Sequence, residues 1–457
     1  MIEVISSDQL LSSLLPVFNI REVGRWTPSR YNIVIYYSDI ILLYNSLSKC
    51  FAQIPVSLGN KLNKDMVMES NDISNDDLLI LANNGFIVPE QINELKTYYE
   101  INDLIRSFKS SETGIKRYNI LTTTGCNIRC FYCFEEGIKP IYMTVDTAEQ
   151  VADYIIDTRD KNNEIQLRWF GGEPLVNNKV IDIICKKLLD NNVLFKSTMS
   201  SNGILFSDSI IKTSKELWNL KKVRTSFDGL EYEHNKRKNA VSSLNPFKIT
   251  ASNIEKLINA GINVDIRFTL DLDNSSDLLK LAKFLCNKYE GNSLVKMYTR
   301  CIFQETTSSA ATNNLKKVQE TISKKEELDQ YLRNRNVFDY NRLLPVGYQP
   351  YYCAANDPNA VVISPNGELC CCETIDESSI FWGNITGDMY DNEERGKWLS
   401  HSEPHEKCKS CKFLPSCTPF AKNNCKNDYF DCVGRAENCY KIYLIHLYQQ
   451  INKDKLS

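Results

Sequence analysis

Between Arg117 and Phe303 the sequence alternates six short strand-like runs with five longer segments of helical pattern. The strand-like runs are RYNILTTTG, EIQLRWFGGEP, LFKSTMSSNG, KKVRTSFDG, NVDIRFTL and SLVKMYTRCIF. In the segments between them, apolar residues recur at helical spacing, and Ser, Thr, Asp or Asn stands near several starts. Repeated strand–helix units form a parallel sheet with right-handed crossovers. We therefore predict an α/β fold centred on a partial (β/α)6 barrel, with its chemistry at the carboxyl ends of the strands.

Three cysteines follow the first predicted strand in TTTGCNIRCFYCFEEG. Cys126, Cys130 and Cys133 have the spacing C-x3-C-x2-C, with no fourth Cys or His nearby in sequence. A structural zinc site is closed by four protein ligands, and its C-x2-C pairs usually come in twos. Three thiolates instead suit an iron–sulfur cubane in which one iron stays open to an exogenous ligand. The alternatives are a zinc site completed by a distant residue and a plain loop.

Charge and cysteine content limit the classes of function. The net charge is −3 and the isoelectric point is near 6.0, without the basic surplus that nucleic-acid binders usually carry. The most apolar stretch, YNIVIYYSDIILLYNSL, is too short and too interrupted to span a bilayer, and no export signal is visible at the amino terminus. We expect a cytoplasmic protein with no nucleic-acid or membrane partner. Its seventeen cysteines must then serve something other than structural disulfides.

The cysteine loop, followed by FGGEP at the end of the second predicted strand, resembles the radical S-adenosylmethionine (SAM) superfamily. The resemblance covers about residues 117–301. It implies that the three cysteines hold a 4Fe-4S cluster, whose open iron binds the methionine part of SAM. It also implies that Tyr132 stacks on the adenine, and simple core packing is the alternative for this ring. Gly171 and Gly172 would let the backbone approach SAM, and Glu173 would accept a hydrogen bond from the SAM ammonium group.

Two further strand-end motifs extend this resemblance. SSNG and SFDG are similar to the third and fourth strands that contact the ribose and the carboxylate of SAM. The candidate residues there are Ser200, Asn202 and Ser226. A basic residue after the fourth strand often pairs with the SAM carboxylate in related enzymes, and HNKRK offers Arg237 or Lys238 one position out of the expected register. A plain solvated charge is the alternative for either residue.

Ten cysteines between Cys353 and Cys439 resemble the SPASM extension of radical SAM enzymes, which usually carries two further 4Fe-4S clusters. The resemblance implies one auxiliary cluster on Cys353, Cys372 and Cys425, with Cys370 or Cys371 as a fourth ligand, and a second on Cys408, Cys411, Cys417 and Cys439. Cys432 competes for either cluster. The cysteine expected shortly after Cys417 is replaced by TPFA. Two zinc ribbons are the alternative.

These segments predict a domain order along the chain. Residues 1–110 are expected to form a small α+β module that resembles the leader-peptide recognition elements of peptide maturases. A winged helix is one candidate for its fold, and a structural cap is the alternative role. The order continues with a radical SAM core at 111–303, a polar linker and helix at 304–344, a SPASM domain at 345–445 and a tail at 446–457. Recognition elements of this kind bind a peptide as an added strand.

From this resemblance we expect a maturase that cleaves SAM reductively and removes a hydrogen from a residue of a ribosomally made precursor peptide. The product would be a cross-link or another modification, and reduced flavodoxin or ferredoxin would donate the electron. Glu373 occupies the place of a carboxylate general base in sulfatase-maturing relatives, although a surface acid is the alternative. The alternative functions are sulfatase-maturing-type protein oxidation, small-molecule dehydrogenation and a zinc-binding interaction protein.

Overall fold

The computed structural model describes residues 2–62, 67–111, 114–133, 135–242, 244–302, 311–343, 354–373, 381–390, 392–399, 406–416 and 432–454. The chain forms two compact units. The first unit contains residues 1–111, 340–352 and 401–457, and the second contains residues 112–339 and 353–400. Segments that are far apart in the sequence therefore share a unit.

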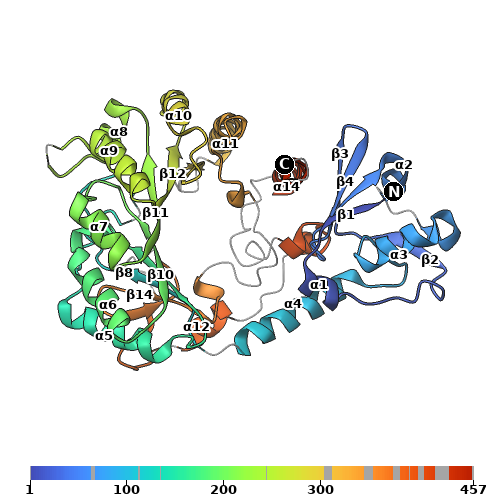
Figure 1. Cartoon of the computed structure of the whole chain (residues 1–457), viewed down its shortest axis with the longest axis horizontal. Helices are drawn as coiled ribbons and strands as arrows, with labels where there is room; N and C mark the ends of the chain where they lie inside the picture. The colour runs from blue at the N-terminus through green and yellow to red at the C-terminus, as the bar shows by residue number, and fades with distance from the viewer. Residues whose placement is uncertain are drawn as a thin grey trace. The chain divides into compact units, whose positions relative to one another are not determined.

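The second unit is built on a sheet with the strand order β13-β12-β11-β10-β9-β8-β14-β15-β16 (Figure 1). Its first six strands pair in parallel, each with the next along the chain. These strands are β8 (Arg117–Leu121), β9 (Ile165–Phe170), β10 (Phe195–Ser200), β11 (Leu220–Phe227), β12 (Asn263–Leu270) and β13 (Val295–Cys301). All six fall in the predicted strand-like runs except for Leu220, the first residue of β11, and the predicted partial barrel is confirmed.

Helices fill the connections between these strands and lie along the outer side of the sheet (Figure 1). They are α5 (Val145–Thr158), α6 (Asn178–Asp190), α7 (Asp208–Glu216), α9 (Pro246–Asn259) and α10 (Ser275–Tyr289). Side chains of Thr144, Ser207 and Asn245 accept backbone N–H bonds at three of their amino termini, as the sequence pattern predicts. The pattern missed α8 (Glu231–Lys238), because its residues EYEHNKRK carry no apolar stripe.

The cysteine-rich part of this unit extends the same sheet beyond β8. β14 (Ala360–Ile363) pairs in parallel with β8, and β15 (Glu368–Cys370) and β16 (Phe381–Asn384) follow in antiparallel order. Helix α12 (Asn392–Leu399) comes next in the chain. The expected exposed helix after the core is α11 (Ala311–Asn334), but one of its faces is covered, since Leu328 and Leu332 are buried.

The first unit contains two small sheets. One has the order β1 (Glu3–Ser6), β5 (Phe51–Pro55), β4 (Ile40–Asn45), β3 (Asn32–Tyr37), and the other has the order β6 (Met68–Glu69), β2 (Arg25–Pro28), β7 (Ile87–Pro89). Helices α1 (Gln9–Leu14), α2 (Val56–Lys61), α3 (Asn75–Asn83) and α4 (Glu94–Ser111) accompany them. From the end of the chain come α13 (Glu406–Lys409), the 3-10 helix η5 (Leu414–Ser416) and α14 (Cys432–Asp454). Tyr440 and Leu444 of α14 pack in one apolar cluster with Ile33 and Leu42.

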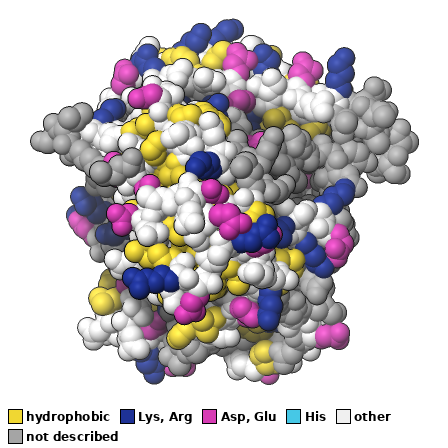
Figure 2. Space-filling view, turned by 90° about the vertical axis from the view of Figure 1, so that its right-hand side faces the viewer, with side chains coloured by type: hydrophobic (Ala, Val, Ile, Leu, Met, Phe, Trp, Pro, Cys, Tyr) yellow, Lys and Arg dark blue, Asp and Glu magenta, His cyan; other side chains and the backbone are white. Residues whose placement is uncertain are grey.

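The described surface mixes the two signs of charge. On the face shown in Figure 2, lysine and arginine side chains stand among aspartate and glutamate side chains, with apolar groups between them. Among the helices that the structure describes, none has the length and apolar character needed to cross a membrane.

Candidate functional site

The three cysteines of the C-x3-C-x2-C motif lie in one loop after the carboxyl end of β8. The Cys133 N–H donates to the Cys130 carbonyl at 3.0 Å, and the Arg129 N–H donates to the carbonyl of Lys238 at the end of α8, at 2.9 Å. Burial raises the pKa of the Cys126 thiol to about 12. No group of three His, Cys, Asp or Glu side chains within the described ranges forms a ready metal site. The assignment of these cysteines to a cluster therefore stays a prediction from spacing and shared loop.

Gly171 and Gly172 bring the loop after β9 against the cysteine loop. A Cβ on Gly172 would lie 2.5 Å from the carbonyl oxygen of Gly125, and one on Gly171, whose φ is 131°, would clash with the carbonyl of Thr123. The Gly172 N–H donates to the Thr123 carbonyl at 3.1 Å, and the Glu173 N–H donates to the Gly125 carbonyl at 2.9 Å. Here the two glycines permit a close approach between two segments of backbone. Their predicted contact with SAM stays a prediction.

The carboxylate of Glu173 is fully buried and links β9 to the loop after β10. Its Oε1 accepts hydrogen bonds from the Ser201 hydroxyl at 2.9 Å and the Leu175 N–H at 3.2 Å. Its Oε2 accepts from the Asn202 N–H at 2.7 Å. Burial raises the pKa of Glu173 to about 7, although these bonds favour the ionised form. The predicted bond to the SAM ammonium would share a carboxylate that the chain already uses to join two strand ends.

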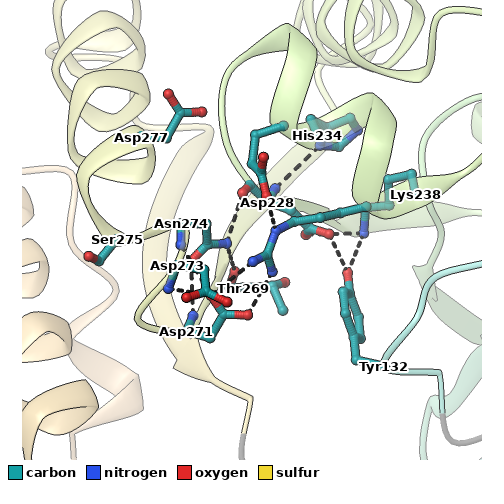
Figure 3. A network of polar contacts seen from close by, with 12 residues as sticks. Tyr132, Asp228, His234, Lys238, Thr269, Asp271, Asp273, Asn274, Ser275 and Asp277 are labelled. Carbon is teal, nitrogen blue, oxygen red and sulfur yellow. Dashed lines mark hydrogen bonds and ion pairs between the residues drawn. The ribbon is translucent and has the colours of Figure 1, made fainter. Parts of the chain in front are cut away.

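Tyr132 belongs to a buried polar network at the ends of β11 and α8 (Figure 3). Its hydroxyl donates to Asp228 Oδ2 at 2.7 Å and accepts from Lys238 Nζ at 2.8 Å. Lys238 Nζ also lies 3.3 Å from Asp228 Oδ1 and donates to Ser226 Oγ at 2.9 Å. Burial lowers the pKa of Lys238, but the Asp228 carboxylate and Tyr132 outweigh it, and the pKa ends above its ordinary value. Lys238 is therefore a buried cation beside the cysteine loop.

Arg237, the other basic candidate, has different partners. Its Nη1 and Nη2 contact the two carboxylate oxygens of Asp271 at 2.8 and 2.9 Å, and its Nε donates to Glu233 at 2.6 Å. Two carboxylates already neutralise this guanidinium. Of the two candidates, Lys238 is the one that contacts Ser226. Burial raises the pKa of the Cys130 thiol, and the nearby charge of Lys238 opposes that rise.

Buried polar atoms at the barrel fit a polar ligand near the cysteine loop. Asn202 Nδ2 donates to Asn127 Oδ1 at 2.7 Å and lies 3.8 Å from Cys126 Sγ, while Ser200 is the half-buried last residue of β10. Asn119 Oδ1 on β8 and Arg267 Nε on β12 are buried without a hydrogen-bond partner among the residues the structure describes. Buried polar atoms normally have partners. Thiols and such atoms together fit a SAM-binding iron–sulfur site.

The carboxy-terminal cysteines of the second unit lie on and after β15. Cys370 is buried and its thiol donates to the Cys372 carbonyl at 3.2 Å, whereas Cys372 is exposed. Burial raises the pKa of the Cys370 thiol. The predicted general base, Glu373, lies 2.7 Å from Arg168 Nη1 on β9. Cys353, expected beside them, lies outside the described residues.

The remaining cysteines lie in the first unit. Cys408 and Cys411 form a tight turn in which the Cys411 N–H donates to the Cys408 carbonyl at 3.0 Å. The Phe413 N–H points at Cys411 Sγ at 3.4 Å, and Cys439 is half-buried on α14. Cys417 and Cys425 lie outside the described residues, and so does the side chain of Cys432. These ligand assignments stay predictions.

Sequence reasoning missed several residues that organise the site. Ser201 and Asp228 lie inside the motifs SSNG and SFDG, but the candidates predicted from these motifs were their neighbours Ser200, Asn202 and Ser226. The available signal for Asp228 was an acidic residue placed directly after a strand of the parallel sheet. Arg168 gave no local signal, because its partner Glu373 is 205 residues away.

Comparisons with known proteins agree with this geometry. Residues 120–285 match the model of the Radical SAM superfamily. The match runs from β8 into α10 and indicates a Radical SAM domain in this part of the chain.

Two curated relatives and one solved structure illustrate the likeness. Radical SAM cyclopropyl synthase TigE of Paramaledivibacter caminithermalis is 28% identical over 215 residues, which are 43% of either chain. GTP 3',8-cyclase of Clostridium perfringens (strain 13 / Type A) is 29% identical over 173 residues, 36% of this chain and 50% of the cyclase. The chain thus spans half or less of these relatives. The structure of anSMEcpe with bound AdoMet covers 75% of this chain and 100% of its own, with a TM-score of 0.55 and 15% identity, and it shows a shared fold.

Proposed function

We propose that this protein is a radical SAM maturase that modifies a ribosomally made precursor peptide. The observation that carries the proposal is the meeting of three strand-end segments around the cysteine loop. Gly172 fits against Gly125, and Glu173 joins Ser201 and Asn202. Such convergence at the carboxyl ends of parallel strands is where barrel enzymes do their chemistry.

The bound cluster and SAM would supply a 5'-deoxyadenosyl radical able to remove a hydrogen atom from an unactivated carbon. Cys126, Cys130 and Cys133 would hold the cluster. Lys238 and Ser226 would face the SAM carboxylate, Asn202 and Ser200 the ribose, Tyr132 the adenine and Glu173 the ammonium. The chain's own contribution is to position these groups and exclude water, which the burial of Glu173, Asp228 and Lys238 supports.

Two auxiliary 4Fe-4S clusters would use the carboxy-terminal cysteines. Together with the SAM-binding cluster they would bring the loaded enzyme to about twelve irons. Anaerobic reconstitution followed by iron and sulfide analysis tests this number. About eight irons would mean that one auxiliary site stays empty, and four would leave only the radical SAM cluster.

The peptide would bind at the amino-terminal module by strand addition. β3 is an edge of its sheet, and no strand among the described residues pairs with its outer side. The opposite edge, β1, is shorter and its pairing is irregular between Val4 and Ser6, which makes it a poorer template. A solved structure of anSMEcpe with bound AdoMet and a Cp18Cys peptide, similar in fold to this chain at 16% identity, supports the proposal of a peptide substrate.

The decisive experiment supplies the enzyme anaerobically with SAM, a reductant such as reduced flavodoxin or ferredoxin, and candidate precursor peptides taken from short reading frames beside the gene. The expected products are 5'-deoxyadenosine and a peptide of altered mass. Hydrogen exchange should then show slower amide exchange in β3 when the peptide is added, with the paired strand β4 unchanged. Modification of the peptide without any protection of β3 would support the maturase function and refute peptide docking on β3.

A small-molecule reaction is the second candidate, because GTP 3',8-cyclase is among the relatives. Radical formation would then depend on a nucleotide rather than on a peptide. Measuring 5'-deoxyadenosine with GTP alone and with the peptide alone separates the two functions.

A further inference from the structure

Arg267 on β12 is a half-buried cation for which the described part of the chain supplies no carboxylate. Its Nε is buried without a hydrogen-bond partner, and no carboxylate among the described residues forms an ion pair with it. A guanidinium stays charged at every pH at which the protein works. Withdrawing such a charge from water costs free energy unless an anion compensates it. Arg267 therefore points to an anionic group that belongs beside it.

The side chain of Arg267 lies on the inner face of the sheet, beside the predicted SAM site. Successive side chains of a strand point to opposite faces, and its two neighbours in β12 are fully buried apolar residues. Arg267 is paired in register with Ser226 of β11, whose hydroxyl accepts from Lys238 Nζ at 2.9 Å. Burial raises the pKa of the Cys130 thiol, and the charge of Arg267 is among those that oppose the rise. Arg267 is thus close to the cysteine loop.

A second donor without a partner lies two residues further along the same face. Thr269 is buried, and its Oγ1 forms no hydrogen bond with a described residue. Its place near the carboxyl end of β12, before the turn that holds Asp271, is visible in Figure 3. A carboxylate accepts hydrogen bonds from several donors at once, and a guanidinium matches its planar shape. Arg267 and Thr269 together therefore suit a carboxylate.

The carboxylates described on this face and at its carboxyl end already have cations. Asp265, two residues before Arg267 on the same face, lies 3.4 Å from Lys222 Nζ and 4.0 Å from Arg224 Nη2. The pairs at the strand ends are Asp228 with Lys238, Glu373 with Arg168 and Asp271 with Arg237. These acids do not need Arg267 for their own compensation.

Two further carboxylates near the cysteine loop, those of Glu135 and Glu173, are buried. Burial raises the pKa of each to about 7, and no cation among the described residues opposes the rise. Arg267 therefore does not serve as their partner. The anion that Arg267 fits has to come from a bound molecule.

We propose that Arg267 binds a carboxylate of the precursor peptide inside the barrel and so selects an acidic group next to the site of hydrogen removal. This inference rests on the proposed peptide maturase and names the chemistry of the group that it binds. Thr269 donates a second hydrogen bond to the same carboxylate. The carboxylate belongs to an Asp or Glu side chain or to the carboxyl terminus of the peptide. Lys238 and Ser226 stay with the SAM carboxylate, so that two different cations hold the two carboxylates.

The experiment is a cycle of enzyme and peptide variants on the full, anaerobically reconstituted enzyme. It uses the candidate precursor peptide that wild type modifies. Each Asp and Glu of that peptide is replaced singly by Asn or Gln, and a separate peptide carries an amidated carboxyl terminus. One of these changes should lower kcat/KM for modification by wild type about tenfold or more, because a charge-assisted hydrogen bond is lost. Which peptide suffers tells a side chain from the chain end.

The enzyme variants assign that preference to one residue. Arg267→Gln should modify the acidic peptide and its amide counterpart with about equal kcat/KM, whereas Arg267→Lys should keep part of the preference. Lys221→Met, a change at an exposed lysine of the neighbouring strand β11, should keep all of it. Iron content and the dissociation constant for SAM should stay at the wild-type value in each variant.

Several results would overturn the inference. If wild type tolerates every amide replacement, no carboxylate is recognised, whatever the enzyme variants do. Weaker SAM binding or lost iron in both Arg267 variants would assign Arg267 to the cofactor. Formation of 5'-deoxyadenosine that GTP alone drives and that Arg267→Gln abolishes would give the site to a phosphate. A wild type that modifies no candidate peptide refutes the proposed function as well, whereas a modified peptide whose acids are dispensable refutes only the role of Arg267.

Discussion

The cysteine loop after β8 and the cysteine turn at Cys408 use the same side chain in differently built surroundings. Around the loop, the main contacts join consecutive strand ends, such as Ser201 to Glu173 across 28 residues and Tyr132 to Asp228 across 96. Around the turn, Ser46 reaches Lys412 across 366 residues. The first site is assembled by a repeating local topology, and the second by docking of the two ends of the chain within one unit.

This difference changes how the amino-terminal module can be tested. Deletion of residues 1–105 would be expected to affect only peptide binding if the module were a separate recognition element. Because Arg30, Ser46 and Lys49 contact the segment 409–416, the deletion also removes the surroundings of Cys408 and Cys411. Loss of peptide binding in such a truncation would not by itself show that the module recognises the peptide.

The largest expected effect separates the cysteine loop from the carboxy-terminal cysteines. Replacing Cys126, Cys130 and Cys133 together with Ala should abolish 5'-deoxyadenosine formation while about eight auxiliary irons remain, because the two sites lie on separate elements. Cys286→Ala, a buried position on α10, is the matched control and should keep both. Product analysis and iron determination check this. Continued SAM cleavage by the triple variant would refute the cluster assignment.

The surroundings of the cysteine loop were easier to predict from the sequence than those of the cysteine turn, because they depend on consecutive strands. Alternating strands and helices fixed the order of β8 to β13, so that motifs at their ends had to converge. The roles of individual residues inside the site were harder to predict. Nothing local distinguishes Lys238, which pairs with Asp228, from Arg237, which pairs with Asp271. Both residues lie on helix α8, which lacks an apolar pattern.

The long-range parts could not be predicted from local patterns. β14 pairs with β8 although more than 230 residues separate them. Its sequence, AVVI, is too short to indicate which strand it pairs with. In the same way, nothing near Lys49 in the sequence predicts its contact with Ser416. Register and docking over such distances depend on the whole core, and not on the period of one segment.

A second prediction concerns the stability of the loop's surroundings. Lys238→Met would leave the fully buried Asp228 without its cation and should lower the free energy of unfolding by about 3–5 kcal/mol. Lys186→Ala, which breaks the exposed pair with Asp190, should change the free energy of unfolding far less, because water screens that pair. Urea unfolding of the iron-free proteins measures both. Equal values would mean that water already compensates Asp228.

The third prediction tests whether Glu373 is the general base, by the substitution Glu373→Gln. If Glu373 is the general base, product formation should fall about a hundredfold while SAM cleavage is retained. Arg168→Gln removes the partner of Glu373 at 2.7 Å and separates positioning from proton transfer. Quantifying modified peptide and 5'-deoxyadenosine in one reaction provides the readout. A parallel fall of both products would assign Glu373 to the fold, and no change in either would place the base elsewhere.

The smallest expected effect is a pH dependence confined to the surroundings of the cysteine loop. His234 on α8 is buried against Phe227 and Phe247, and its Nδ1 accepts the Asp228 N–H at 3.3 Å. Burial, reinforced by the charge of Lys238, lowers the pKa of His234 well below 6.5.

The native protein therefore keeps His234 neutral while the unfolded chain binds a proton below about pH 6.5, so stability falls as the pH falls. From pH 7.5 to 5.5 this contribution amounts to about 1.4 kcal/mol. Denaturant unfolding at both pH values, on wild type and on His234→Gln, checks the value. The variant should lose that part of the pH dependence, and an identical pH profile in both proteins would show that folding does not change the pKa of His234.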